Sequence, residues 1–209
     1  MTWDSVDSID WDLLPSSFVI KCNHDSGGII ICKDKSALNI RKAKELLSYH
    51  LSHDNYSITR EWPYKNVQKR LLCEPYIEDS DTGELRDYKF FCFNGEPKVL
   101  FIATDRSNPN TETKFDVFDM SFNHLPLEYI HPNSNKAIEK PKCFDEMVLI
   151  ARKLSEGFPH VRVDLYQVNN KVLFGELTFF SGSGFGSFNP SKYDDEWGDW
   201  ILLPEEKLI

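Results

Sequence analysis

The chain has 209 residues and a formal net charge of −9, with 41% hydrophobic and 27% charged residues. This composition is typical of a soluble globular protein and excludes a collagen-like, disordered or disulfide-stapled chain. The acidic balance argues against a nucleic-acid partner held through a basic face, although it allows a local basic pocket for a small phosphate ligand.

The cysteines, histidines and N-terminus indicate a reducing compartment and no metal cage. The five cysteines are dispersed and contain no CxxC pair, so we expect buried, reduced thiols in a cytoplasmic protein. Only His50 and His53 are closely spaced, at the end of a predicted helix, where we expect both to be solvated. The first 14 residues lack the features of a signal peptide, and no apolar run approaches the about 20 residues of a transmembrane segment.

The N-terminal third predicts a hairpin, a helix and a further strand. Apolar residues at helical spacing predict a helix from a Ser36 cap to about residue 51. Residues 54–69 are expected to be irregular, because Trp62-Pro63-Tyr64 breaks regular structure. The predicted strands are 18–22, 29–32 and 70–78, with a Gly-Gly turn between the first two.

The rest of the chain predicts further hairpins around one helix. The turns Asn94-Gly95 and Asn169-Asn170 each join two strands, and a helix extends from Cys143 to Glu156 before Gly157. The predicted strands cover 87–93, 98–106, 114–120, 161–168 and 172–180. Residues 181–190 are read as a glycine-rich loop. Antiparallel hairpins with two long helices predict a mixed α+β fold.

Carboxylates on the last predicted hairpin suggest a metal site. Arg162 and Asp164 are two residues apart and share a face of their strand, as do Glu176 and Thr178 on the next strand. If the turn pairs these strands, Asp164 lies near Glu176, and two facing carboxylates repel unless a cation lies between them. Hard oxygen ligands suit Mg²⁺. Alternatively, both are surface carboxylates partnered by Arg162.

Lys21 and the glycines that follow it suggest a phosphate site. Lys21 interrupts an apolar strand, where an ammonium group is costly without a partner such as a phosphate. Gly27 and Gly28 could let backbone N–H groups approach phosphate oxygens. Alternatively, Lys21 points to water from an edge strand and the glycines form a simple turn.

Two more strands carry isolated charges. Asp87 and Lys89 share one face of a strand, and Arg106 ends the strand that follows. These three residues either form structural ion pairs or take part in a ligand site. Glu74 lies among apolar residues and is either a strand carboxylate or the mark of a hinge that receives a base.

Taken together, four segments resemble an ATP-grasp enzyme: FVIKCNHDSGG, RLLCEPYIED, DYKFFCFNGEPKVLFIATDR and VRVDLYQVNNKVLFGELTFF. More narrowly, HDSGG, REWPYKN, DYKFFCFNGEPK, RVDLY and GELTF are similar to the TupA-like branch. That branch is named for teichuronopeptide synthesis, is associated with capsule and surface-polysaccharide gene sets, and is sometimes labelled glycosyltransferase. The resemblance covers roughly residues 5 to 200.

The resemblance implies one ATP-grasp domain over 1–209, with antiparallel sheet and helices in two lobes and a nucleotide between them. The first lobe would cover about 15–72, and the second, about 73–200, would carry the metal strands. The implied activity is that of an ATP- and Mg²⁺-dependent carboxylate–amine ligase in surface-polysaccharide synthesis. ATP converts a small or polysaccharide-linked carboxylate to an acyl phosphate, from which an amine displaces phosphate.

The resemblance also assigns roles to residues. The ATP-binding residues would be Lys21, Gly27, Gly28, Glu74, Asp87 and Lys89. The metal ligands would be Asp164, Glu176 and Thr178, and the catalytic residues Arg162 and Arg106. Three departures from the family pattern stand out: Thr178 replaces the usual Asn, Pro75 replaces a common Lys, and the usual N-terminal subdomain is missing. A partner chain could supply that subdomain.

Two other functions compete with a ligase. The chain could be a nucleotide-binding module that is non-catalytic or depends on a partner. It could also bind or transfer sugars, as a glycosyltransferase-like protein would. For that role the aromatic residues Trp62, Tyr64, Trp197 and Trp200 would stack on sugar rings, whereas the alternative places them in packing.

Overall fold

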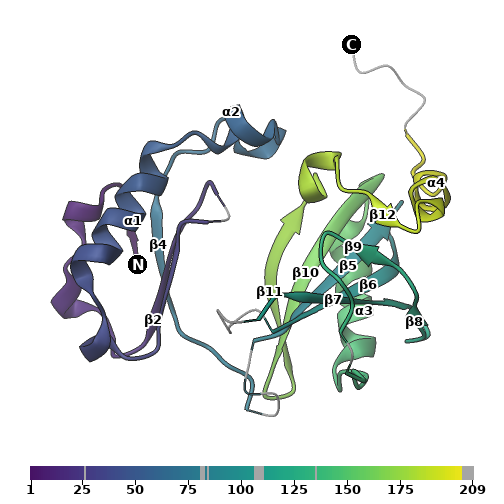
Figure 1. Ribbon diagram of the computed structural model, residues 1–209, viewed down its shortest axis with the longest axis horizontal. Coiled ribbons are helices and arrows are strands. Elements are labelled where there is room, and N and C mark those ends of the chain that lie inside the picture. Colours follow the sequence, from purple (N-terminus) through teal and green to yellow (C-terminus); the bar gives the residue numbers. More distant parts are fainter. Residues whose placement is uncertain (26, 81–82, 84, 106–110, 135, 204–209) are drawn as a thin grey trace. The chain divides into compact units, whose positions relative to one another are not determined.

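The computed structural model describes residues 1–25, 27–80, 83, 85–105, 111–134 and 136–203. The chain divides into two compact units, Met1–Ile77 and Glu78–Ile209 (Figure 1). Each unit combines an antiparallel sheet with helices, so the predicted mixed α+β class is confirmed. No helix in the described part of the chain is long and apolar enough to cross a membrane.

Unit 1 is built on a four-stranded antiparallel sheet with the order β1-β4-β2-β3. Its strands are β1 (Thr2–Trp3), β2 (Phe18–Cys22), β3 (Ile29–Cys32) and β4 (Leu71–Pro75). Its helices are η1 (Val6–Ser8), η2 (Trp11–Leu13), η3 (Lys35–Ala37), α1 (Ile40–Ser52), α2 (Asn55–Thr59) and η4 (Trp62–Tyr64). The predicted hairpin is confirmed, because β2 pairs with β3 from Phe18 opposite Cys32 to Lys21 opposite Ile29.

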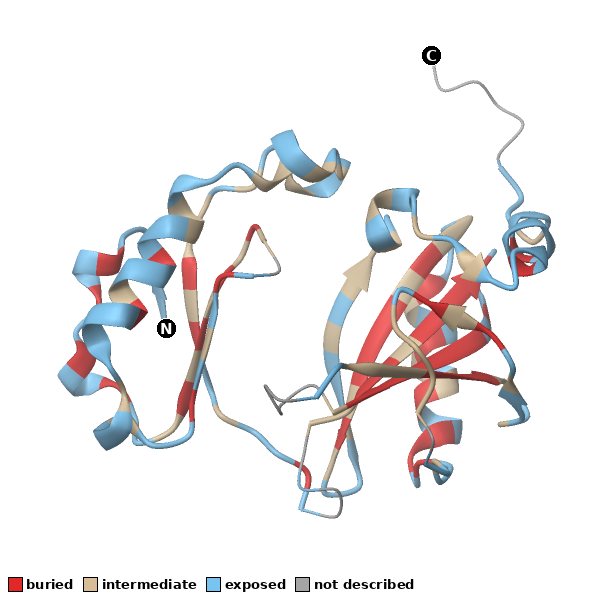
Figure 2. Cartoon of the chain, viewed as in Figure 1, coloured by how far each residue is buried: buried red, intermediate tan, exposed pale blue. Residues whose placement is uncertain are grey.

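One face of the unit 1 sheet carries the core. Alternate residues of β2 are buried and join the cluster that includes Ala43 and Leu47 of α1 (Figure 2). The predicted Ser36 cap is wrong. The helix begins at Ile40, because the Asn39 side chain accepts a hydrogen bond from the Lys42 N–H at 3.0 Å, whereas Asp34 caps the separate turn η3.

Unit 2 is built on a six-stranded antiparallel sheet with the order β11-β10-β5-β6-β7-β8. The strands of this sheet are β5 (Asp87–Phe93), β6 (Glu96–Thr104), β7 (Lys114–Asp119), β8 (His124–Leu125), β10 (His160–Val168) and β11 (Lys171–Thr178). The other elements are β9 (Glu128–Tyr129), α3 (Phe144–Ser155), η5 (Ser181–Gly184), β12 (Phe188–Asn189) and α4 (Lys192–Gly198). Both predicted hairpins form, as β5 with β6 and β10 with β11.

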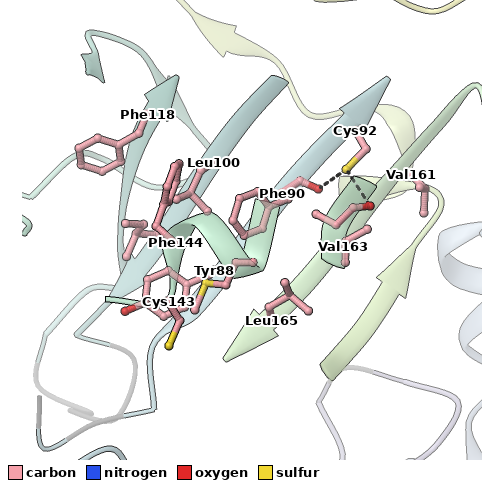
Figure 3. Close-up of a cluster of buried hydrophobic side chains, with 13 residues drawn as sticks. Tyr88, Phe90, Cys92, Leu100, Phe118, Cys143, Phe144, Val161, Val163 and Leu165 are labelled. Atoms are coloured by element: carbon pink, nitrogen blue, oxygen red, sulfur yellow. Dashed lines mark hydrogen bonds between the residues drawn. The ribbon is translucent and has the colours of Figure 1, made fainter. Parts of the chain in front are cut away.

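The unit 2 sheet has cores on both faces. On one face, α3 packs on a cluster that includes Phe90, Leu100 and Val163 (Figure 3). On the other face, Phe91, Phe101 and the α4 residue Trp197 belong to an aromatic cluster. Since successive strand residues alternate between faces, Asp87 and Lys89 share the face of Phe91 rather than that of Phe90.

The cysteines behave as the sequence indicates. All five are free and buried. Burial in the unit 1 core raises the pKa of Cys22 to about 12, with a smaller contribution from the Asp25 charge. Burial likewise raises the pKa of Cys92 to about 11. These thiols are therefore protonated near neutral pH and act as small apolar side chains.

Candidate functional site

Three neighbouring strands of unit 2 bring charged side chains into one row. Asp164 of β10 lies opposite Lys89 of β5 on one side and opposite Glu176 of β11 on the other. Arg162 lies opposite Thr178 by the same register. The expectation that the turn brings Asp164 next to Glu176 therefore holds in the structure.

A glycine bulge places Glu176. The register of β10 and β11 shifts after Asp164, which lies opposite Glu176 while Leu165 lies opposite Phe174, so Gly175 is the extra residue. A Cβ on Gly175 would come within 2.9 Å of the Asp164 carbonyl oxygen and of the Tyr166 ring. The bulge therefore requires glycine directly beside a candidate ligand, a feature that spacing alone did not predict.

Asp164 is the centre of a buried ion-pair network. Its side chain is only 1% exposed, which contradicts the alternative that it is a surface carboxylate. The Arg162 guanidinium donates from Nε to Oδ1 at 2.7 Å and from Nη2 to Oδ2 at 2.8 Å. Lys89 Nζ donates to Asp164 Oδ2 at 2.5 Å and lies 3.4 Å from Asp87 Oδ2. Both carboxylate oxygens are thus bound by cations.

Burial and neighbouring charges shift the pKa values of this network. Burial alone would raise the pKa of Asp164, but the charges and hydrogen bonds of Arg162 and Lys89 outweigh it and hold that pKa below its usual value. Burial lowers the pKa of Lys89, and the attraction of Asp164 compensates for only part of this effect. For Arg162, burial would lower the pKa, but the charge and hydrogen bonds of Asp164 together with the charge of Glu176 outweigh it, so the pKa is raised.

Arg162 also reaches residues at the end of β11. Its Nη2 donates to Glu176 Oε1 at 3.2 Å, and its Nη1 donates to Ser181 Oγ at 3.0 Å. Thr178 Oγ1 donates to the same Glu176 oxygen at 3.3 Å. Sequence reasoning missed Ser181, whose only signal is its place in the glycine-rich stretch that directly follows the strand.

Three side chains of the charged row carry oxygen atoms of the kind that Mg²⁺ binds. Asp164, Glu176 and Thr178 supply two carboxylates and one hydroxyl on two paired strands. The Glu176 side chain is 59% exposed, whereas the oxygens of Asp164 are held by cations. Among described residues, no group of three or more His, Cys, Asp or Glu side chains could hold a metal ion. Of the two carboxylates only Glu176 is therefore open to an ion, and a ligand's phosphates would have to supply most of the oxygens around it.

In unit 1, Lys21 forms an ion pair with another predicted site residue. Its Nζ lies 2.8 Å from Glu74 Oε2, and both side chains are partly exposed. Lys21 lies directly opposite Ile29 and Leu72, on the face of the sheet away from α1. Ile29 is exposed, so this face offers a cation beside apolar surface.

The loop after β2 is held by His50, whose side chain was expected to be solvated. His50 is not solvated, because its Nδ1 lies 2.5 Å from Asp25 Oδ2 and its side chain is largely buried. The other Asp25 oxygen accepts the Gly28 N–H at 2.9 Å. A Cβ on Gly27 would come within 2.8 Å of the His50 ring. The glycines therefore allow the loop to pack closely against the end of α1.

We expect Gly28→Ala to destabilise unit 1 by about 1–3 kcal/mol, the usual cost of forcing atoms into packed space. The new methyl group would lie 2.7 Å from Cys22 Sγ and 2.8 Å from His50 Cβ. Urea unfolding followed by circular dichroism measures the effect. Gly198→Ala is the control, because a Cβ there meets no atom within 4 Å. Equal stability of the two variants would contradict the close packing of the loop.

Arg106 lies outside the described residues, so its predicted catalytic role stays a prediction. The remaining predicted residues fall into two groups. Unit 1 contains Lys21, Gly27, Gly28 and Glu74. Unit 2 contains Asp87, Lys89, Arg162, Asp164, Glu176 and Thr178.

A family comparison identifies the class of protein and its branch. The family model for TupA-like ATPgrasp matches residues 1–202. The chain belongs to the TupA-like ATP-grasp family. No curated protein sequence matches it.

Solved structures of similar fold share little sequence with the chain. D-alanine–D-alanine ligase from Bacillus anthracis, complexed with ATP, is 14% identical with a TM-score of 0.42, over 85% of this chain and 45% of that one. D-alanyl-alanine synthetase A from Vibrio cholerae is 11% identical with a TM-score of 0.44, over 86% and 49%. The ATP-grasp ligase PsnB, complexed with its minimal precursor, Mg and ADP, is 10% identical with a TM-score of 0.41, over 88% and 46%. The chain thus spans about half the length of these structures.

Proposed function

We propose that the protein is an ATP- and Mg²⁺-dependent ligase that joins a carboxylate to an amine in surface-polysaccharide synthesis in the cytoplasm. Membership of the TupA-like ATP-grasp family supports the class of reaction. The observation that carries the proposal is the row of Lys89, Asp164 and Glu176 across three strands, with Arg162 bound to both carboxylates. Such a row combines cations for phosphate oxygens with carboxylates for a metal ion.

In the proposed reaction, a carboxylate oxygen attacks the γ-phosphorus of ATP, and the bond to the β-phosphate oxygen breaks to release ADP. The amine nitrogen then attacks the carbonyl carbon of the acyl phosphate, inorganic phosphate leaves, and the nitrogen loses a proton to give the amide. Lys21 and Lys89 would bind phosphate oxygens, and Arg162 would contact the transferred phosphoryl group. Asp164 and Glu176 would hold Mg²⁺, which would neutralise the phosphate charge when bound.

Calorimetric titration with Mg-ATP tests the nucleotide site. We expect binding by the unmodified chain, and a loss of about 10- to 100-fold in affinity for Lys21→Ala and Glu176→Gln, as for the removal of one charged contact. The Lys21 side chain is 40% exposed and that of Glu176 is 59% exposed, so the variants should fold. Lys42→Ala, at an exposed position on α1, is the control and should bind ATP normally. Unchanged affinity in both site variants would contradict the assignment.

A second candidate is a nucleotide-binding module that does not catalyse ligation by itself. The observation in its favour is that both Asp164 oxygens are already bound by Arg162 and Lys89, which leaves Glu176 as the exposed carboxylate. Amide product formed by the isolated chain from ATP, a carboxylate and an amine would exclude this candidate. Binding of a sugar nucleotide instead of ATP would favour the glycosyltransferase-like alternative.

A further inference from the structure

The segment from Leu51 to Arg70 contributes no buried residue, although it is rich in aromatic and apolar side chains. Trp62 is 61% exposed and Ile58 is 71% exposed, and Tyr56 and Tyr64 are only partly covered. Trp62 is the one exposed tryptophan among the five, all of which lie in the described part of the chain. Exposed aromatic surface of this kind is typical of a binding site.

Cations lie against these rings. Lys65 Nζ is 4.2 Å from the centre of the Trp62 ring and 5.7 Å from that of Tyr56. The Arg60 guanidinium is 5.8 Å from the centre of the Tyr56 ring. Residues 54–70 carry four basic and two acidic side chains, in a chain whose net charge is −9. The segment is therefore a local basic and aromatic surface on an acidic protein.

Local hydrogen bonds, not core packing, fix this arrangement. Helix α2 ends at Thr59 and is followed by Arg60, whose backbone is left-handed with φ 59° and whose N–H donates to the Tyr56 carbonyl at 2.9 Å. Thr59 Oγ1 donates to the Asn55 carbonyl at 3.1 Å and accepts the Glu61 N–H at 3.3 Å. Pro63 then restricts the backbone next to Trp62 in η4. The left-handed Arg60 is thus the C-cap of this helix.

A pocket of about 190 Å³ adjoins the same segment. Its lining consists of Asp25, Gly27, Tyr49, His50, His53, Asn55 and Ile58, and the Asp25 carboxylate is paired there with His50. Asn55 and Ile58 belong to α2, the helix that also presents Tyr56. Hydroxyl, imidazole and amide groups can donate and accept the hydrogen bonds that sugar hydroxyls require.

We propose that the α2–η4 surface, defined as Tyr56, Arg60, Trp62 and Lys65 with the adjoining pocket, binds an acidic saccharide. A pyranose ring has an apolar C–H face for Trp62, a carboxylate for Lys65 and Arg60, and hydroxyl groups for the pocket. A neutral sugar would leave the cations unused, and the net charge of −9 opposes a long polynucleotide. The identification of this saccharide as the carboxylate substrate rests on the proposed function, whereas its binding does not.

Calorimetry with a galacturonic acid tetramer tests the proposal, and the methyl-esterified tetramer is the uncharged control ligand. We expect the acid to bind at least about tenfold more tightly than the ester, and about 0.5 M NaCl to remove most of that difference. Trp62→Ala should weaken binding of the acid by about tenfold, and Lys65→Ala by about fivefold. Lys153→Ala, at an exposed position on α3, should bind normally.

Three results would overturn the proposal. No binding, equal binding of acid and ester, or unchanged affinity in Trp62→Ala would contradict an acidic-saccharide site. Loss of Mg-ATP binding in Trp62→Ala, with no effect on saccharide binding, would assign the surface to the nucleotide. The two proposals fail separately: Mg-ATP binding without saccharide binding overturns only this inference, and saccharide binding without Mg-ATP binding overturns only the proposed ligase function.

Discussion

Asp164→Ala is expected to lower the free energy of unfolding by about 3 kcal/mol and to abolish Mg-ATP binding. Removing one partner of a buried ion pair costs about 3–5 kcal/mol, because an uncompensated charge stays behind. The expected loss lies at the lower end of this range, since Lys89 still lies 3.4 Å from Asp87 and Arg162 still contacts Glu176 at 3.2 Å. Urea unfolding followed by circular dichroism measures the loss of stability, and calorimetry measures the loss of binding.

The control is Glu176→Ala, which should cost no more than about 1 kcal/mol, because the Glu176 side chain that pairs with Arg162 is 59% exposed to solvent. It should still weaken Mg-ATP binding, and so separate stability from function. Equal destabilisation by the two substitutions would contradict the central place of Asp164.

The contribution of Asp164 to the free energy of unfolding should decrease as the pH falls. The pKa of Asp164 is lower in the folded chain than its usual value, so the folded state favours the ionised form. The stabilisation is therefore complete above the unfolded pKa of about 4 and disappears as the pH falls through the folded value. The difference in stability between Asp164→Ala and the unmodified chain should be constant from about pH 6 to 8 and shrink below about pH 4.

The charged row could be predicted from the sequence because it depends on local rules. Residues two apart on a strand share a face, and the Asn169-Asn170 turn fixes which strands pair. These rules place Asp164 near Glu176. The bulge at Gly175 and the contact of Arg162 with Ser181 depend on tertiary packing, which spacing within one strand does not encode.

The contacts of the loop after β2 could not be predicted from the sequence for a different reason. Asp25 and His50 are 25 residues apart in sequence, and only the approach of α1 to the loop brings them within 2.5 Å. A histidine at the end of a helix is usually solvated, so the position of His50 at the end of a predicted helix indicated an exposed side chain. The sequence allowed two interpretations of Gly27 and Gly28, a phosphate site or a simple turn, and in the structure a Cβ on either glycine would come within 2.8 Å of a His50 atom. The phosphate role stays a prediction that the Mg-ATP titration can test.

Helix α4 was missed because local sequence hardly favours it. It has only seven residues and ends with glycine, and an isolated helix of that length is unstable in water. Its stability comes from Tyr193 and Trp197, which pack into the aromatic cluster of the unit 2 sheet. The alternative that placed Trp197 in packing rather than on a sugar is therefore the one observed.

Trp197→Ala is expected to cost about 3–5 kcal/mol, the usual range for deleting a buried aromatic side chain. The side chain is 4% exposed, and its ring lies 4.5 Å from that of Phe188, 6.1 Å from Phe101 and 5.8 Å from Trp200. Without this anchor, α4 should detach from the sheet and unfold. Trypsin should then cleave rapidly after Lys192, and urea unfolding should shift to a lower midpoint.

Trp62→Ala is the matched control, because it removes the same side chain from a site that is 61% exposed. It should change stability by no more than about 0.5 kcal/mol and leave cleavage after Lys192 slow. The stability of Trp197→Phe should lie between those of the two alanine variants, since a smaller ring keeps part of the contact with Phe188. If the two alanine variants lost equal stability, or if Trp197→Ala stayed resistant at Lys192, then α4 would be held by contacts other than its tryptophan. The same pair of variants also separates the two uses of tryptophan in this chain, because only Trp62→Ala should weaken saccharide binding while the fold stays intact.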